Sequence, residues 1–176
     1  MGRSTSELQK PSVPIGAPQP WRIGVIESLW APSPTGLMAC CCPCIVMAQV
    51  ASRMALYGGY ALVLGATIAM MLVEATSYVT ATVSVDPHDG IGFALVRSAG
   101  LAAGSGLVFL LGSLRRNVRS RWHLEGSELE DILCALCCPP CTLAQLTTQV
   151  ELYDETTSVF GPRNVLRRFS LEPDAL

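Results

Sequence analysis

Two short clusters hold all eight cysteines of this chain, and their spacing suits thiolate chemistry. The first cysteine cluster is CCCPC, residues 40–44, and the second is CALCCPPC, residues 134–141. The second contains two interleaved CxxC units, a spacing that brings sulfur ligands onto one soft cation such as zinc or cadmium. We expect the two clusters to meet as halves of one metal site, or to form two, with these ligands: Cys40, Cys41, Cys42, Cys44, Cys134, Cys137, Cys138 and Cys141.

Two charged residues interrupt long apolar runs. Glu74 is the one charge in residues 57–82, and Arg97 is the one charge in residues 91–114. A charge in hydrocarbon is costly, so such residues usually pair or line a polar path. We expect Glu74 and Arg97 to face each other or a neighbouring subunit as a transmembrane polar pair. In the alternative, each side chain snorkels outward.

Small and basic residues complete the set of candidate sites. Gly100 and Gly104 form a GxxxG pattern, which lets helix backbones approach closely within a hairpin or an oligomer. A basic segment follows directly, and it attracts anionic lipid or simply anchors the helix end. RRFSL, residues 167–171, makes Ser170 a candidate phosphosite. The basic residues that we expect to face lipid are Arg115, Arg116, Arg119 and Arg121.

The elements that must position these residues are two membrane-spanning helices. Both apolar runs reach the length of about 20 residues that a spanning helix needs. DPHDG, residues 86–90, lies between them and is a turn signal. A soluble core helix of this length would be amphipathic, and these runs have no polar face. We therefore predict a mainly α fold: a membrane helical hairpin with helices at about 57–82 and 91–114.

Composition agrees with a small membrane module. Half of the 176 residues are hydrophobic and 15% are charged, against about 25% charged in ordinary soluble domains. The net charge of -2 gives no case for nucleic-acid binding. No secretory signal is expected at the start, and no catalytic motif appears, so we do not expect an enzyme. We predict a disordered Pro-rich tail at 1–20, the Cys-rich membrane domain at 21–152 and a flexible tail at 153–176.

The basic residues set the expected orientation. Arginines crowd beyond the second run and Arg53 precedes the first, whereas the connecting loop has no Lys or Arg. The positive-inside rule therefore places both termini and both cysteine clusters in the cytosol. The cytosol keeps thiols reduced, so we expect no disulfide framework. S-acylation remains open, because it is typical of cytosolic cysteines beside a membrane helix.

The order of these motifs resembles the Cys-rich placenta-specific-eight family, which includes cornifelin, plant cadmium resistance proteins and cell-number regulators. The resemblance covers about residues 20–152. Two departures stand out: Glu27-Ser28 replaces an Asp-Cys, and QLTTQV, residues 145–150, replaces an ending with acids and an arginine. The matching residues are Trp21, Gly24, Cys44, Gln49, Arg115, Arg119, Arg121, Trp122, Gly126, Asp131, Cys137, Cys138, Cys141 and Gln145.

The resemblance implies a small integral membrane protein, often oligomeric and often in the plasma membrane. It also implies a link to the export or tolerance of zinc and cadmium, or to the control of cell number. Together with the thiols, this predicts a homo-oligomer in the lipid bilayer that handles divalent metal ions, with zinc as the expected bound metal. The alternative is an S-acylated membrane scaffold that regulates growth signalling and transports nothing.

Overall fold

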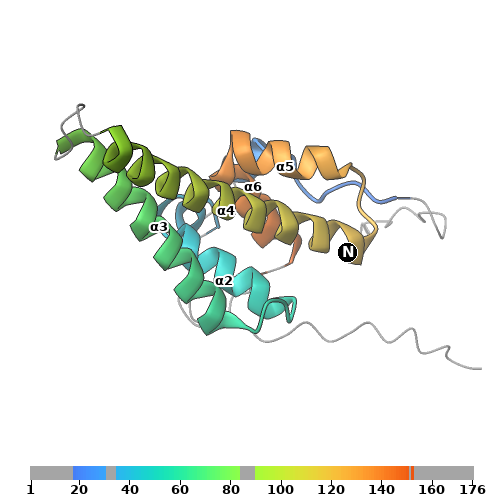
Figure 1. Ribbon diagram of the computed structural model, residues 1–176. Coiled ribbons are helices and arrows are strands. Elements are labelled where there is room, and N and C mark those ends of the chain that lie inside the picture. The colour runs from blue at the N-terminus through green and yellow to red at the C-terminus, as the bar shows by residue number, and fades with distance from the viewer. Residues whose placement is uncertain (1–17, 31–34, 84–89, 151, 153–176) are drawn as a thin grey trace, which may run out of the picture.

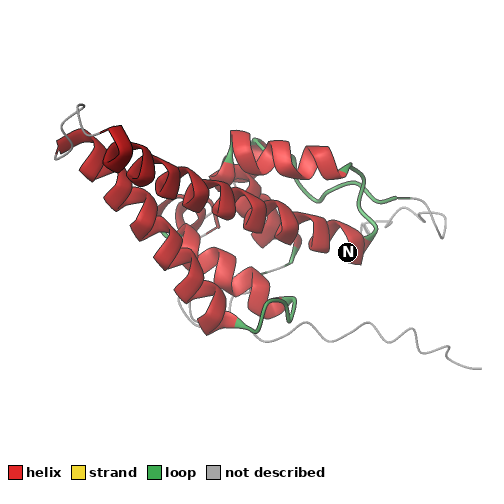
Figure 2. Cartoon of the chain, viewed as in Figure 1, coloured by secondary structure: helices red, strands yellow, loops and turns green. Residues whose placement is uncertain are grey.

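Helices dominate the structure, as the sequence predicts (Figure 2). The computed structural model describes residues 18–30, 35–83, 90–150 and 152. The predicted tails, apart from residues 18–20, and Ser170 therefore lie outside the described residues. Within those ranges, the one strand-like pairing is an isolated parallel bridge between Gln19 and Leu124. The helices are η1 (Glu27–Trp30), α1 (Thr35–Cys41), α2 (Pro43–Arg53), α3 (Tyr60–Val83), α4 (Gly90–Trp122), α5 (Glu128–Cys137) and α6 (Pro139–Gln149).

Helices α3 and α4 form the predicted antiparallel hairpin, whose far end projects away from the other helices (Figure 1). Both are long and apolar enough to cross a membrane. Only 17% of the apolar stretch of α3 and 11% of that of α4 is buried. A core helix of a soluble protein would be mostly buried, so this exposure fits the predicted pair of transmembrane helices. We call residues 67–83 and 90–110 the hairpin arm.

The ends of both hairpin helices differ from the prediction. Helix α3 begins at Tyr60 rather than near residue 57, because Gly58 and Gly59 have positive φ angles of 76° and 96° and interrupt the helix. Helix α4 continues to Trp122 rather than ending near residue 114. Nothing between 114 and 122 breaks a helix, and arginine is a good helix former. The basic segment is therefore the last two turns of α4.

A helical bundle surrounds the other end of the hairpin. Helix α2 packs against α3, helix α5 packs against α4, and α6 contacts η1, α1, α2 and α4 (Figure 1). The buried core includes Val46 and Val50 of α2, Leu114 of α4 and Leu143 and Leu146 of α6. These side chains are at most 1% exposed, which is why the bundle can hold the last turns of α4 in a fixed position.

Candidate functional site

A groove of about 620 Å³ opens where the hairpin arm meets α5. Its walls are mainly apolar, but each hairpin helix contributes one charged side chain, Glu74 from α3 and Arg97 from α4. An apolar groove with a few polar groups is the usual form of a binding site or passage. The lining residues are Glu74, Ser77, Tyr78, Arg97, Gly100, Leu101, Gly104, Ser105, Val108, Phe109, Ile132 and Leu136.

Glu74 and Arg97 share this groove without an ion pair. Both side chains are exposed, and among the described residues the structure records no salt bridge between them. The Glu74 carboxylate instead lies beside Gly104, where an added Cβ would be 3.1 Å from Oε1. The expected pairing within one chain is therefore absent from the described part. The other expectation, contact with a neighbouring subunit or a polar path, stays a prediction.

Gly100 and Gly104 lie on the face of α4 that contacts α3. A Cβ added at Gly100 would be only 2.9 Å from Cβ of Ser77, which is closer than real Cβ atoms approach. Ser77 is itself 9% exposed, so it has little space to move away. The small residues thus set how closely the two hairpin helices pack, as expected for a GxxxG pattern.

The two cysteine clusters have the same local structure. Each is a junction between two helices, where a cysteine takes the position before the helix and a proline begins it: Cys42 before Pro43 in α2, and Cys138 before Pro139 in α6. Proline suits this position because the first turn of a helix leaves its N–H groups without intrahelical partners. The cysteine-proline pattern therefore starts two core helices. Each helix contains a buried glutamine, Gln49 in α2 and Gln145 in α6.

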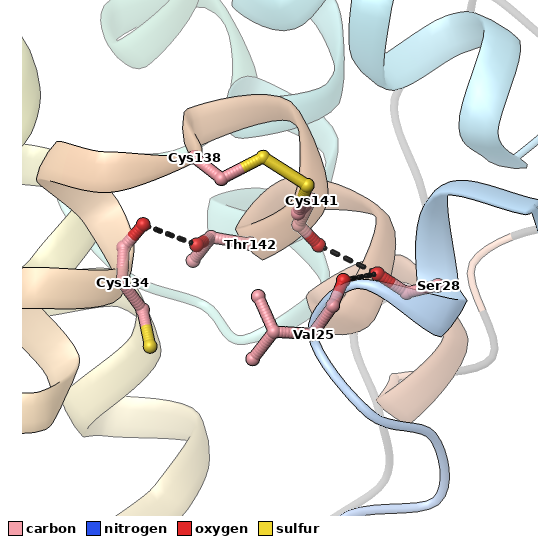
Figure 3. Close-up of a disulfide and its surroundings, with 6 residues drawn as sticks. All are labelled: Val25, Ser28, Cys134, Cys138, Cys141 and Thr142. Atoms are coloured by element: carbon pink, nitrogen blue, oxygen red, sulfur yellow. Dashed lines mark hydrogen bonds between the residues drawn. A yellow bond between two sulfur atoms is a disulfide. The ribbon is translucent and has the colours of Figure 1, made fainter.

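The second cysteine cluster contains a disulfide between Cys138 and Cys141, so the expectation of no disulfide is wrong for this pair (Figure 3). The pair is possible because one turn of α6 brings the two ends of the CPPC sequence together, whereas the expectation of no disulfide rested on the reducing cytosol. The backbone is held locally by Ser28, whose Oγ donates a 2.8 Å hydrogen bond to the carbonyl of Cys141. The Cys134 sulfur points away from the disulfide (Figure 3).

A resident zinc ion does not fit the cysteines as the structure places them. All eight cysteines are described, yet no three His, Cys, Asp or Glu side chains within the described ranges gather closely enough to hold a metal. The disulfide also occupies two of the expected ligands. Structural zinc needs four such ligands. Within the described ranges no shared thiol site is formed, and Cys40, Cys41 and Cys137 are exposed.

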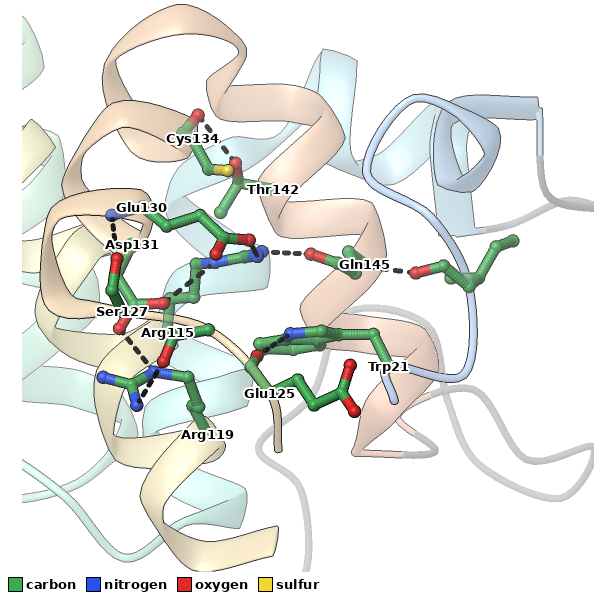
Figure 4. Close-up of polar contacts among 12 residues, drawn as sticks. Trp21, Arg115, Arg119, Glu125, Ser127, Glu130, Asp131, Cys134, Thr142 and Gln145 are labelled. Atoms are coloured by element: carbon green, nitrogen blue, oxygen red, sulfur yellow. Dashed lines mark hydrogen bonds and ion pairs between the residues drawn. The ribbon is translucent and has the colours of Figure 1, made fainter. Parts of the chain in front are cut away.

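The most connected polar site of the bundle centres on Arg115 (Figure 4). Its guanidinium is 1% exposed and lies 3.1 Å from Oδ1 of Asp131, which is 2% exposed. Another guanidinium nitrogen donates to Oε1 of Gln145, and the ring of Trp21 lies 4.3 Å from the guanidinium carbon. Gln145 in turn donates to the backbone carbonyl of Ile23 at 2.8 Å. The network joins α4, α5, α6 and the segment before η1.

Asp131 binds a second arginine with its other oxygen. Arg119 Nε donates to Oδ2 of Asp131 at 2.9 Å, and Arg119 also donates to the carbonyl of Gly126. Because Arg119 is one turn beyond Arg115 on α4, both guanidinium groups reach the same carboxylate. One buried carboxylate thus holds two turns of α4 against the start of α5.

The arginines of α4 therefore divide into two pairs. The expectation that all four face lipid is wrong for Arg115 and for Arg119, which is 16% exposed, because both point into the bundle toward Asp131. Arg116 is 58% exposed and pairs with Glu128 at 2.8 Å. Arg121 is also exposed, although it donates to the backbone of Met54. The helical period explains the split, since residues 115 and 119 share one face.

The chain departs from the family pattern in two places, and each of these places contains a buried, uncharged side chain. Ser28 is fully buried, and its hydroxyl donates hydrogen bonds to the backbone carbonyls of Val25 and Cys141. Gln149 is 5% exposed and accepts a 3.1 Å hydrogen bond from the backbone N–H of Arg22. Without a paired charge, a buried neutral amide avoids the desolvation penalty that a carboxylate would meet.

Sequence reasoning missed the role of this network. Arg115, Asp131 and Gln145 were recognised as motif positions, but the sequence alone did not show that they contact one another. The available signal was the spacing of Arg115 and Arg119 on one helical face, together with the acidic residues Glu128, Glu130 and Asp131 at the start of α5. Cys134 lies nearby, and burial raises the pKa of its thiol, an effect that Arg115 opposes and that Glu130 and Asp131 reinforce.

No curated protein and no solved structure matches the chain in sequence or fold comparisons. The sequence profile of one family does match, over residues 21–149. This range contains the hairpin, both cysteine clusters and every member of the Arg115 network. The chain belongs to the PLAC8 family.

Proposed function

We propose that this chain is a non-enzymatic integral membrane protein that passes divalent cations of the zinc and cadmium class through an oligomer. In this proposal the hairpin crosses the bilayer, both termini face the cytosol, and the plasma membrane is the host membrane. The cation is the cargo rather than a resident cofactor. The observation that carries the proposal is the groove in which Glu74 and Arg97 are exposed on apolar helices without pairing with each other.

Elementary electrostatics supports a role for these charges. A charged side chain at the centre of a bilayer costs a few kcal/mol or more, so an unpaired one needs a partner or water. Among its described residues, one chain supplies no ionic partner to Glu74. A neighbouring copy would bring further acids and bases to the same depth and enclose a polar path. A carboxylate at that position attracts cations, and exposed thiols such as Cys40 and Cys137 favour soft ones.

The second candidate is an S-acylated scaffold that conducts nothing. It is favoured by the three exposed thiols, Cys40, Cys41 and Cys137, together with the lack of a described cluster of three metal ligands. Acyl chains on these cysteines would fix both helix junctions to the membrane. Hydroxylamine-sensitive fatty acid on the wild-type chain, combined with no cation flux, would favour the scaffold over the cation path.

The deciding experiment is cation uptake into vesicles that contain the full chain, with Glu74→Gln as the test variant. Removing the carboxylate charge should lower radioactive zinc or cadmium uptake by about ten-fold, the effect of losing roughly 1.4 kcal/mol of cation stabilisation. Glu125→Gln is the matched control, because Glu125 is exposed and lies outside the groove. It should leave uptake within about two-fold of wild type, since exposed charges contribute little.

The result also has a clear negative form. Equal uptake by the wild type and Glu74→Gln, at equal protein density in the vesicles, would contradict the cation path. No uptake above empty vesicles by the wild type would contradict transport altogether. Measuring the metal bound to the purified, reduced chain tests whether the exposed thiols capture the cation before it passes. Replacing Cys40, Cys41 and Cys137 with serine should lower the bound metal but leave the hairpin inserted.

A further inference from the structure

Large apolar side chains are exposed on the bundle as well as on the hairpin. Among the residues that the structure describes, the exposed large apolar side chains outside α3 and α4 lie in the segment around η1, in α1 and in α5, with Tyr57 as the one exception. Trp30 is 85% exposed and Leu129 is 67% exposed, so these are not marginal cases. The full set is Ile26, Trp30, Leu37, Leu129, Ile132, Leu133 and Leu136.

Helix α5 concentrates four of them on one face. Leu129, Ile132, Leu133 and Leu136 follow the spacing i, i+3, i+4, i+7, which places them on one stripe of a helix. The opposite face contains Asp131 and Ala135, which are buried against the bundle. A water-soluble helix normally turns its apolar stripe inward. Here the polar, paired carboxylate points inward and the apolar stripe points outward.

This stripe is continuous with the surface of the hairpin arm. Helix α5 runs back along α4, since Glu128 pairs with Arg116 whereas Ile132 lies against Gly112, with its Cα 3.7 Å from an added Cβ. Further along, Ile132 and Leu136 line the same groove as Val108 and Phe109. The C-terminal end of α5 therefore reaches the part of α4 that is long and apolar enough to be in a membrane.

Exposed charges are sorted in the same direction. Arg116 and Glu128 pair on the surface at the beginning of α5, away from the hairpin arm. Residues 132–150 contain no charged residue at all. Polarity thus falls along α5 toward the hairpin arm, which matches the change from water to acyl chains at the surface of a bilayer.

We propose that α5 is an interfacial helix that enters the membrane beside α4, with Glu128 at the aqueous boundary and the stripe of Leu129, Ile132, Leu133 and Leu136 in contact with lipid acyl chains. The proposal rests on the proposed membrane insertion of the hairpin. A protein partner fits less well, because a stable protein interface takes about 20–30 residues from each side and this stripe supplies four. Lipid needs no such matched surface, and it already covers the neighbouring hairpin arm in the proposed function.

Depth-dependent quenching tests the proposal on the full chain, reconstituted in vesicles of phosphatidylcholine and phosphatidylglycerol with brominated acyl chains. A fluorescent amino acid with an apolar side chain replaces Leu133 in one variant and Leu136 in another. Leu72, 60% exposed on the hairpin arm and outside the groove, is the lipid reference, and Glu128, 64% exposed, is the water reference. Quenching at 133 and 136 should be within about two-fold of that at 72 and about three-fold or more above that at 128.

The outcomes separate this inference from the proposed function. Strong quenching at 72 with weak quenching at both 133 and 136 would overturn the interfacial helix and leave hairpin insertion standing. If those two positions were also shielded from aqueous iodide, a second copy or another protein would cover the stripe instead. Weak quenching at 72 would overturn membrane insertion itself, and the interfacial helix with it. Agreement between the variants at 133 and 136 guards against one misfolded variant.

Discussion

Arg115 is the residue whose surroundings contrast most with its sequence context. It follows an apolar span and begins a run of arginines, so sequence favours a residue at the lipid headgroups. In the bundle it is instead desolvated and shared among Asp131, Gln145 and Trp21. A planar guanidinium presents its donors in a rigid fork and can stack on an aromatic ring, whereas a lysine ammonium is a compact point charge on a flexible stem. Three helices therefore depend on one side chain for their relative position.

Arg115→Ala should destabilise the protein strongly. The change leaves Asp131 with one arginine partner and Gln145 without its donor, and breaking a buried pair typically costs about 3–5 kcal/mol. Thermal unfolding in detergent, followed by circular dichroism, measures the loss. Arg116→Ala is the matched control, because its pair with Glu128 is exposed and such pairs contribute about 0–1 kcal/mol. Similar melting temperatures for the two variants would contradict a structural role for the network.

The raised pKa of Cys134 predicts unequal reactivity within the second cysteine cluster. Burial favours the neutral thiol, and alkylation needs the thiolate. Alkylation of Cys134 by iodoacetamide should therefore keep accelerating above the ordinary thiol pKa, and the pH profile should lie to the alkaline side of that of a model peptide. Mass spectrometry of the labelled chain gives the rate at each pH.

Glu130→Gln provides the internal comparison for this profile. Glu130 contributes to the raised pKa of Cys134, so removing its charge should move the profile to lower pH. The shift should be modest, because Glu130 is 49% exposed and water screens its charge. A shift to higher pH would contradict the assigned cause.

At the scale of elements, the hairpin and the helix junctions follow different rules. The hairpin helices pack closely at small residues, which is the usual packing of helices in lipid, where no hydrophobic driving force brings them together. The bundle helices α2 and α6 pack through buried aliphatic side chains, as in a soluble domain. The two cysteine clusters lie where α2 and α6 begin, and their prolines fix the starts of these helices.

Gly100→Val should loosen the hairpin. A Cβ there meets Ser77 at 2.9 Å, and overpacking of this kind costs about 1–3 kcal/mol. Gly92→Val is the control, since an added Cβ at Gly92 meets nothing within 4 Å. Both changes place a β-branched residue in α4, so helix propensity cancels in the comparison. Unfolding of the two variants in mixed detergent micelles measures the difference, and equal stability would contradict close packing at Gly100.

The whole molecule is a hairpin arm on a helical bundle, and every arginine that the structure describes, except Arg97, lies on the bundle side. Labelling with a membrane-impermeant maleimide should therefore distinguish the two ends in intact cells, using single cysteines in a chain whose own cysteines are replaced. His88→Cys, in the sequence between α3 and α4, should react from outside. Glu125→Cys, exposed on the bundle, should react only after permeabilisation.

Both sites should react after detergent is added, which controls for access to the thiols. The reverse pattern would place the arginines outside and contradict the proposed orientation. Reaction of both sites in intact cells would show that the hairpin does not separate them, and this would contradict membrane crossing.

The sequence by itself determined the helical class and the two long apolar helices. These follow from local rules, since run length and charge act within one segment of chain. The predicted turn between them falls mostly on residues 86–89, which lie outside the described residues. The sequence also determined that small residues on α4 would allow close packing. The starts of α2 and α6 at Cys42-Pro43 and Cys138-Pro139 follow a local rule as well, but neither helix was predicted from the sequence.

Only the tertiary structure decided which side chains meet. Arg115 and Gln145 are 30 residues apart, and no local pattern states that both reach one buried position. The separation of the thiols was decided in the same way, because the packing of α1, α5 and α6 directs Cys134 away from the disulfide and leaves Cys40, Cys41 and Cys137 on the surface. Contacts between distant segments depend on how whole helices pack, and desolvation then decides whether a charge must be paired.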